Sequence, residues 1–347
     1  MSLPSSPFLA ACRGETPAVT PVWFMRQAGR SLPEYRALRA EHKFQELITN
    51  PMLAAEVTLQ PVRRHGVDAA IFFSDIITSV QSFCDGVSIE PNRGPVIEAP
   101  FRSVGDVDRL KGFEPETHVP YVIEAVQRAV AELDPLGVPL IGFAGAPFTV
   151  ATYLVEGGKS KEFEHTKYLM RAEPDTWRAL MDALSEIAIS TLRAQVNAGA
   201  SAVQLFDSWA GILSKEDYRR FVLPWSSKVF SGLADLGVPR IHFGVGTGEL
   251  LELMYAAGAD VVGVDWRVSL VDARDRVGMT PALQGNLDPV ALLGPPVVAE
   301  QAVQDVLNDA EKAGGSYIFN LGHGVLPSTD PATLTAVVAQ VHRATQR

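Results

Sequence analysis

Two arginines four residues apart are the most chemically suggestive feature of the sequence. Arg26 and Arg30 follow an apolar run in the stretch WFMRQAGR at residues 23–30. A guanidinium group is planar, stays charged and binds a carboxylate through two parallel hydrogen bonds. A pair of such groups in an acidic chain predicts a local site for an anionic ligand, most simply one that carries carboxylates. The alternative is that both arginines form structural ion pairs, for example with Glu34.

Other polar side chains directly follow apolar runs later in the chain. Asp75 ends the run AAIFFSD; as a carboxylate it could accept hydrogen bonds from ligand N–H groups, and as an acid it could deliver a proton. Burial would raise its pKa and an arginine would lower it, and it could instead cap the next helix. Tyr153 and Ser208 offer hydroxyl groups that could orient a carboxylate, or could simply pack or cap. His323 lies between two glycines that leave its ring accessible, although a structural histidine is an equal alternative.

The motifs of common metal and cofactor sites are absent or incomplete in the sequence. GVGTGE at 244–249 lacks the GxGxxG spacing of a dinucleotide turn, and GGKS at 157–160 lacks the first glycine of a P-loop. There is no HExxH, and Gly244 rather than cysteine stands two residues after His242, so no HxC zinc pair forms there. No lysine follows any of the predicted strands. None of these short motifs therefore predicts a metal or cofactor site.

A repeated junction predicts the elements that position these side chains. Seven times a helical pattern ends at a glycine and an apolar run follows within a few residues, and a glycine just past a helix adopts the left-handed conformation at little cost. These glycines are Gly66, Gly137, Gly199, Gly237, Gly258, Gly278 and Gly314. The runs that follow predict strands near 69–73, 140–144, 202–206, 240–244, 261–265, 282–285 and 317–320, and the run at 22–25 would make an eighth.

Short apolar strands that alternate with helices are typical of a parallel sheet covered on both faces. Eight such units predict an α/β fold, a single (β/α)₈ TIM-type barrel domain over residues 1–347, although an open doubly wound sheet has the same pattern. The longest excursion, roughly 77–138, should contain a hairpin in GVSIEPNRGPVIE. Among the helices, 175–198 has one apolar face with Asp175 as its cap, and Ser214 to Asp217 predicts a capping box.

The composition limits the class of protein and its partners. The chain has 347 residues and a formal net charge of −10. Its contents of 47% hydrophobic and 20% charged residues are typical of globular proteins. An acidic balance disfavours nucleic acids and acidic membrane surfaces as partners. No apolar run approaches the roughly 20 residues that span a bilayer, and the N-terminal segment lacks the basic region of a signal peptide. Cys12 and Cys84 suggest no disulfide framework. We expect a cytoplasmic protein.

Long segments of the sequence resemble the uroporphyrinogen decarboxylase family of haem biosynthesis. PVWFMRQAGRSLPEYR at 21–36 resembles the N-terminal signature of that family, and GFAGAPFTVATYLVEGG at 142–158 is similar to its second signature. FDSWAG at 206–211 and FNLGHGV at 319–325 resemble further blocks, so the likeness runs in order through the chain. Ser31 departs from the pattern, since an aromatic residue often stands there, but it is expected to face a loop rather than the chemistry.

The resemblance implies a cofactor-free lyase that removes the carboxyl groups from the four acetate side chains of uroporphyrinogen III, giving coproporphyrinogen III and CO₂. It also implies a (β/α)₈ barrel and a homodimer. Asp75 would bind the pyrrole N–H groups, and the proton donor stays open between Arg26, a bound water and, less favoured, Tyr153. The resemblance implies catalytic roles for Arg26, Arg30, Asp75 and Tyr153. It implies substrate contacts for Arg26, Gln27, Arg30, Asp75, Tyr153, Phe206, Ser208 and His323, with Phe206 on the pocket wall.

Two other functions remain open on the sequence. A methyltransferase of the same fold would need zinc held by a His-x-Cys…Cys set, and Gly244 stands where the cysteine would follow His242. A non-catalytic tetrapyrrole carrier would use the same arginines as the enzyme. The joint presence of the arginine pair with Asp75, Tyr153 and His323 favours catalysis, because binding alone does not require all five groups.

Overall fold

The structure, a computed structural model, describes residues 6–90 and 94–347. Its centre is a parallel sheet of seven strands in the order β1-β4-β5-β6-β7-β8-β9. The strands are β1 (Ala70–Ile71), β4 (Leu140–Gly145), β5 (Ala202–Phe206), β6 (Arg240–Phe243), β7 (Val261–Gly263), β8 (Ala282–Leu287) and β9 (Tyr317–Leu321). Each strand lies within two residues of a predicted run, so these seven predictions are confirmed.

The segment at 21–25 closes the sheet into a barrel. Val22 forms an isolated parallel bridge with Phe319 of β9, whose N–H donates to the carbonyl of Pro21 at 2.9 Å. On the other side, the N–H of Asp68, just before β1, donates to the carbonyl of Val22 at 2.8 Å. The segment therefore stands between the two edge strands in the place of the predicted eighth strand. The open doubly wound alternative is wrong.

A chain of buried polar side chains crosses the interior of the barrel. The indole N–H of Trp23 donates to Gln284 Oε1, and Gln284 Nε2 donates to Gln204 Oε1, both at 3.0 Å. Gln284 lies on β8 and Gln204 on β5, three strands away. Because neighbouring strands are about 4.8 Å apart, these side chains could not meet across a flat sheet. The bonds therefore depend on the curvature of the ring.

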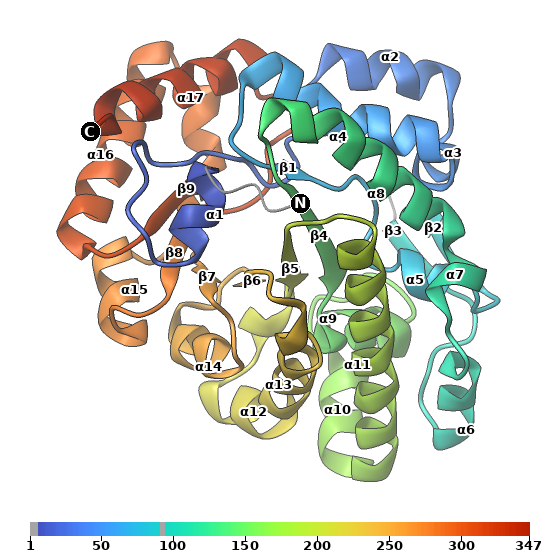
Figure 1. The fold of residues 1–347 in the computed structure, drawn as a ribbon. Helices are drawn as coiled ribbons and strands as arrows, with labels where there is room; N and C mark the ends of the chain where they lie inside the picture. Colours follow the sequence, from blue (N-terminus) through green and yellow to red (C-terminus); the bar gives the residue numbers. More distant parts are fainter. Residues whose placement is uncertain (1–5, 91–93) are drawn as a thin grey trace.

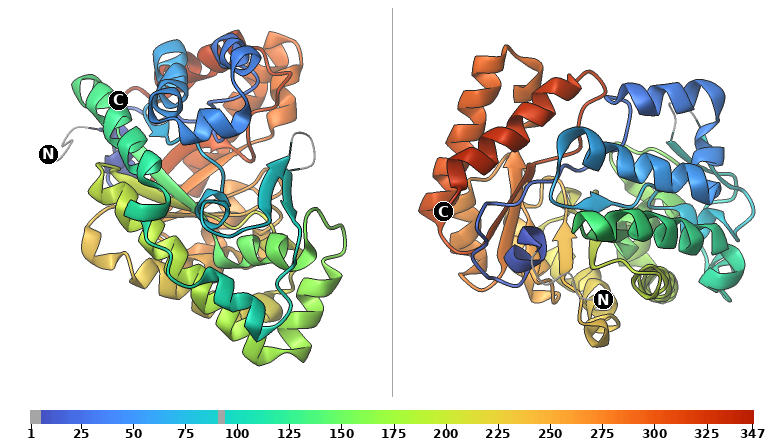
Figure 2. Two further views of the ribbon diagram at one scale, coloured as in Figure 1. Left: turned by 90° about the vertical axis from the view of Figure 1, so that its right-hand side faces the viewer. Right: turned by 45° about the horizontal axis from the view of Figure 1, so that its top comes forward.

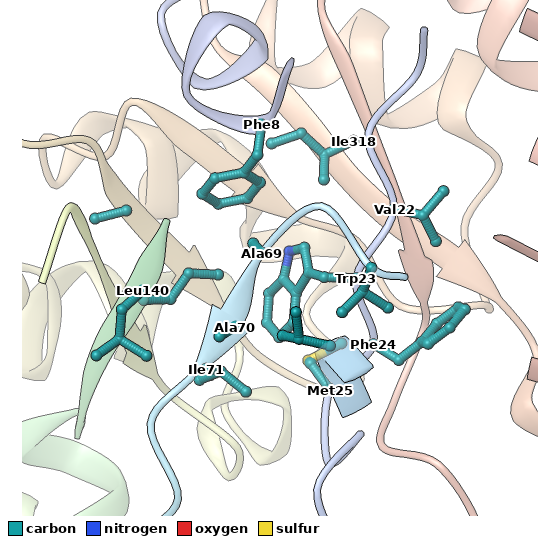
Figure 3. Packing of buried hydrophobic residues seen from close by; sticks show 14 of the residues in the cluster. Phe8, Val22, Trp23, Phe24, Met25, Ala69, Ala70, Ile71, Leu140 and Ile318 are labelled. Carbon is teal, nitrogen blue, oxygen red and sulfur yellow. The ribbon is translucent and has the colours of Figure 1, made fainter. Parts of the chain in front are cut away.

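Apolar side chains fill the barrel around the closing segment. Helix α1 (Pro7–Cys12) contributes Phe8, which is fully buried. Figure 3 shows Phe8 beside Ile318 of β9, with Trp23 and Leu140 of β4 in the same cluster. This packing ties the closing segment and the first helix to the strands.

Helices surround the barrel on its outside (Figure 1), as the two further views also show (Figure 2). None of the helices within residues 6–90 and 94–347 is both long and apolar enough to cross a membrane. In addition to α1, the α-helices are α2 (Pro33–Glu41), α3 (Phe44–Thr49), α4 (Pro51–His65), α5 (Thr78–Gln81), α6 (Val104–Val107), α7 (Pro115–His118), α8 (Pro120–Leu133), α9 (Pro147–Glu156), α10 (Glu164–Ala172), α11 (Pro174–Asn197), α12 (Lys215–Phe221), α13 (Leu223–Ser231), α14 (Leu251–Ala256), α15 (Leu270–Val277), α16 (Pro296–Ala313) and α17 (Pro331–Thr345).

The glycine junctions and the hairpin agree with the sequence. All seven glycines predicted to end helices have a positive φ, from 65° at Gly314 to 118° at Gly199. The hairpin pairs β2 (Val87–Glu90) with β3 (Gly94–Ile97) in antiparallel register. Its turn at 91–93 lies outside the described residues.

The two predicted helix caps have different outcomes. Ser214 is the N-cap of α12 and accepts the N–H of Asp217 at 3.1 Å, while the Asp217 carboxylate binds Arg171. The bond from the Asp217 N–H is the half of the predicted capping box that the structure shows. The prediction for Asp175 is wrong, because α11 begins one residue earlier. Asp175 therefore lies inside the first turn, where it pairs with Arg178.

Candidate active site

Arg26 lies in a turn directly after the closing segment. Its φ is 59°, in the left-handed region that residues with a side chain rarely adopt. Gln27 holds this turn: its side-chain amide accepts the N–H of Phe24 at 3.0 Å and donates to the carbonyl of Ala69 at 3.1 Å. Gln27 is 0% exposed. The structure therefore places its side chain against the backbone, where it fixes the Arg26 turn.

The loop after β9 lies directly against Arg26. A Cβ added at Gly324 would lie 2.3 Å from Cδ and 2.6 Å from Cγ of Arg26, so only a glycine leaves room for that side chain. The N–H of Val325 donates to the carbonyl of Met25 at 2.8 Å and joins the two loops. These contacts bring His323 next to Arg26 from the opposite end of the chain.

Asp75 lies in the loop after β1 and is half-buried. Its Oδ1 accepts the N–H of Ile77 at 3.1 Å, and its own N–H donates to Thr78 Oγ1 at 3.2 Å. Asp75 therefore also organises the chain entering α5, close to the capping role that the sequence left open. Burial raises the pKa of Asp75, and the backbone N–H groups and Arg26 oppose that rise. The result is a sheltered carboxyl group within reach of a cation.

The end of β4 supports the Asp75 loop. A Cβ at Gly145 would lie 2.9 Å from the carbonyl oxygen of Ile76, so the glycine allows the loop to pack closely. A small cavity beside Asp75 is lined in part by Ser79 and Thr191, whose hydroxyl oxygens are 2.7 Å apart. The cavity beside Asp75 is therefore lined by hydroxyl groups as well as by apolar side chains.

Helix α9 follows β4 and carries Tyr153. The Tyr153 ring meets Trp209 edge-on, with ring centroids 6.0 Å apart. Burial raises the pKa of Tyr153; Asp75 adds to the rise, and Arg26 opposes it. The phenol therefore stays protonated at neutral pH and can donate a hydrogen bond to an anion.

The turn after β5 holds Ser208 between two anchored residues. Thr149 of α9 donates its hydroxyl hydrogen to Asp207 Oδ1 at 2.9 Å and accepts the N–H of Trp209 at 3.2 Å. Ser208 itself is half-buried and makes no side-chain hydrogen bond to the described residues. Phe206 meets Phe143 edge-on with centroids 5.4 Å apart, which gives the end of β5 an aromatic wall.

His323 is an uncharged ring at neutral pH. Burial, with the charges of Arg26 and Arg267, lowers the pKa of His323 to about 4. Its imidazole stacks on Trp266 with centroids 6.3 Å apart and an interplanar angle of 6°. His323 can therefore donate or accept one hydrogen bond at each nitrogen without adding a positive charge.

Arg30 is exposed, and its backbone carbonyl accepts Nη1 of Arg36 at 3.0 Å. Glu34, the predicted alternative partner, binds Arg64 instead. Neither Arg26 nor Arg30 forms an ion pair with the described residues. Both guanidinium groups are therefore available to a ligand, and the ion pair proposed as an alternative is wrong.

Arg26 is the electrostatic centre of the predicted group. Its charge acts on three of them: it opposes the rise that burial causes in the pKa of Asp75 and Tyr153, and it adds to the lowering of the pKa of His323. These residues come from the turn after the closing segment, the loop after β1, helix α9 and the loop after β9. Sequence reasoning missed Thr149, because no motif marks a threonine that anchors another loop.

The zinc-dependent alternative lacks space where it needs a cysteine. A Cβ at Gly244 would lie 2.6 Å from Thr247 Cγ2 and 2.8 Å from the carbonyl oxygen of Asp207. The ring of His242 is fully buried, with Nδ1 3.2 Å from the carbonyl oxygen of Met254 and Nε2 3.7 Å from the Asp207 carboxylate. A thiolate beside His242 would require the surrounding backbone to move.

Comparisons with known proteins identify the family of the chain. The family model described as Uroporphyrinogen decarboxylase (URO-D) matches residues 3–344. A protein of Nocardia farcinica named uroporphyrinogen decarboxylase is 57% identical over 345 residues, which cover 98% of this chain and 96% of the relative. A protein of the same name from Thermobifida fusca is 56% identical over 345 residues, which cover 99% of this chain and 94% of the relative. A solved methyltransferase from Methanosarcina mazei has a TM-score of 0.79 over 99% of both chains, but at 21% identity it shows the shared fold alone.

Proposed function

The chain belongs to the uroporphyrinogen decarboxylase family, and we propose that it converts uroporphyrinogen III to coproporphyrinogen III by removing the carboxyl groups of the four acetate side chains. The observation that carries this function is the position of Arg26. It forms no ion pair with any described residue, and its charge acts on a sheltered carboxyl group, a protonated phenol and a neutral imidazole. Such a set suits a ligand that combines carboxylates with pyrrole N–H groups.

Each group has a role that follows from its ionisation. Arg26 and Arg30 bind carboxylates of the substrate, and the protonated Tyr153 donates a hydrogen bond to one of them. Asp75, as a carboxylate, accepts the pyrrole N–H groups at the centre of the macrocycle. Ser208 and His323 contribute hydrogen bonds, while the Phe206 ring forms part of the wall and Gln27 positions Arg26.

The substrate supplies its own electron sink. A proton adds to the pyrrole carbon next to the one that bears the acetate, which makes the ring cationic. The bond to the carboxylate then breaks, its electron pair enters the ring, and CO₂ leaves behind an exocyclic methylene. Protonation of that methylene and loss of the added ring proton give a methyl group and restore the pyrrole. Asp75 stabilises the cationic stage electrostatically, so no cofactor is required.

The ionisation states also bear on the proton donor. Burial raises the pKa of Tyr153 and makes its phenol a weaker acid. This disfavours Tyr153, but a guanidinium holds its proton still more strongly, so of the three candidates a water bound beside Arg26 suits the role best. The four acetates are chemically alike, so the macrocycle can turn and present each of them to the same groups.

Product analysis tests the proposed function. The purified chain is incubated without oxygen with chemically reduced uroporphyrin, after gel filtration in a metal chelator. Stepwise appearance of products with seven, six, five and four carboxyl groups is the expected result. Tight binding without loss of CO₂ would favour the carrier. Neither binding nor turnover, together with stoichiometric zinc in the protein before chelator treatment, would favour the methyltransferase.

The assembly and location of the enzyme are part of the proposal. We propose a homodimer of single-domain barrels, each spanning residues 1–347, that works in the cytoplasm. The support is the resemblance of the signatures to a family whose members are dimeric. Sedimentation velocity at several concentrations tests the dimer, and a single species with the mass of one chain would exclude it.

A further inference from the structure

A third arginine lies at the end of the barrel that carries the predicted site. Arg267 is in the loop after β7, and this loop packs against the loop after β9. A Cβ at Gly322 would lie 2.4 Å from the backbone nitrogen of Trp266, so the two loops are in direct contact. His323 therefore has the Arg26 turn as one neighbour and the Arg267 loop as another.

Trp266 supports the Arg267 side chain. The guanidinium carbon lies 3.9 Å from the centroid of the Trp266 ring, and the same indole stacks on the imidazole of His323. A guanidinium on an aromatic face is held by the cation–π interaction while its N–H groups at the edge remain free to donate. The three planar side chains form one continuous assembly.

Asp265 fixes Arg267 from one side. The Asp265 side chain is 1% exposed; it accepts the backbone N–H of Arg267 at 3.0 Å and Nη1 of Arg267 at 2.7 Å. It also accepts the N–H of Gly246 from the loop after β6. Nε and Nη2 of Arg267 make no hydrogen bond to the described residues, and the side chain is 51% exposed. The guanidinium is thus anchored at one nitrogen and open at two.

The charge of Arg267 reaches the predicted site. It contributes, after burial and Arg26, to the lowering of the pKa of His323. Because that imidazole is neutral, an anionic ligand meets two arginines with an uncharged hydrogen-bonding ring between their loops.

Arg128 shows what an ordinary surface arginine looks like in this chain. Its side chain is 50% exposed and pairs with Glu124 at 2.7 Å, so its exposure and its ion-pair distance match those of Arg267. The pair of Arg128 lies on one helix, however, and Glu124 is itself half exposed. The buried partner and the aromatic support distinguish Arg267.

We propose that Arg267 binds a peripheral carboxylate of the bound tetrapyrrole, on a part of the ring away from the acetate held at Arg26. This inference rests on the proposed function. A macrocycle with eight carboxylates on its rim needs cations spread along an arc of the barrel rather than gathered at one point. The loops that carry Arg26, His323 and Arg267 provide such an arc.

The test compares Arg267→Gln, Arg267→Lys and the matched control Arg128→Gln in the anaerobic decarboxylation assay. Loss of one charge-assisted contact should raise KM about tenfold in Arg267→Gln and change kcat by less than about twofold. The salt dependence of kcat/KM should become shallower in the same variant. Arg267→Lys keeps the charge without the planar fork, so its KM should lie between those of the unmodified chain and Arg267→Gln. The KM of Arg128→Gln should match that of the unmodified chain.

The outcomes separate the inference from the proposed function. If the unmodified chain is active and Arg267→Gln keeps its KM within twofold, the inference is overturned. A loss confined to kcat would also overturn it, because that result indicates a general disturbance of the loop. If the unmodified chain makes no product, the proposed function fails, and fluorescence titration with coproporphyrin then tests Arg267 directly. Weaker binding by Arg267→Gln than by Arg128→Gln supports the inference, and equal binding overturns it.

Discussion

Replacing Gly324 by alanine should disable the site while leaving the fold intact. The added Cβ would lie 2.3 Å from Cδ, 2.6 Å from Cγ and 3.0 Å from Cβ of Arg26. Carbon atoms that are not bonded rest about 3.5–4.0 Å apart, so the Arg26 side chain must move over most of its length. Its backbone cannot easily follow, because the buried Gln27 amide holds the turn.

The size of the effect follows from what Arg26 leaves behind. A displaced guanidinium loses a charge-assisted contact to the substrate, worth about 1.5–3 kcal/mol. Misplacing a reacting group by about 1 Å can cost about 100-fold in rate. We therefore expect kcat/KM to fall about 100-fold or more. The free energy of unfolding should fall by only about 1 kcal/mol, because Arg26 is exposed and can swing into solvent.

The anaerobic decarboxylation assay and urea unfolding measure the two effects separately. Gly105→Ala is the control, because a Cβ there would meet only Ser103 Oγ, at 3.8 Å. In an Arg26→Ala background, Gly324→Ala should cost little more activity, since the group that it displaces is already gone. The reasoning is refuted if Gly324→Ala keeps its kcat/KM within threefold, or if it costs a further 100-fold in that background.

Three further predictions follow from single residues. Asp75→Asn should lose about 100-fold or more in kcat. Because burial raises the pKa of Asp75 above its usual 3.8, the activity of the unmodified enzyme should begin to fall at a pH higher than 3.8 as the solution is acidified. A pH profile that stays flat down to pH 3.8 would contradict this. Gln27→Leu leaves the N–H of Phe24 and the carbonyl of Ala69 unpaired, so urea unfolding should show a loss of about 3 kcal/mol, and an equally stable variant would contradict the assigned role. Burial, with Arg64, lowers the pKa of His65 from 6.5 to about 4, so the unfolded chain binds the proton first as the pH falls. The free energy of unfolding should therefore decline between pH 6.5 and 4, by up to about 3 kcal/mol from this group, and His65→Gln should show a correspondingly smaller decline.

Local backbone chemistry made the strands readable. A positive φ costs glycine little, so each helix that ends this way leaves a glycine in the sequence, as Gly66 and Gly258 show with φ of 66° and 109°. The apolar runs that follow are buried on both faces and need no alternation. Asp175 was placed wrongly because the exact first residue of a helix depends on a few competing local contacts.

The closing segment was the least predictable part of the fold. Its pairing with the sheet is a single bridge, because its hydrogen bonds go to Phe319 on one side and to Asp68 on the other. Those partners are distant in sequence, so the run at 22–25 by itself does not tell a closed ring from an open sheet. The buried position of Gln27 depends on the same closure, since its amide reaches Ala69 beside β1.

The sequence by itself determined where the strands lie along the chain, the glycines that end the helices and the set of polar residues at the strand ends. Only the tertiary structure decided which of these groups meet and how they are charged. Arg26 and His323 are neighbours because Gly324 lets two distant loops touch, and the His323 imidazole is neutral because burial and two arginines lower its pKa. Arg267 lies near His323 because the loops after β7 and β9 pack together and the Trp266 ring contacts both side chains. Burial and charge act through space and sum over residues far apart in the chain, so no local pattern records them.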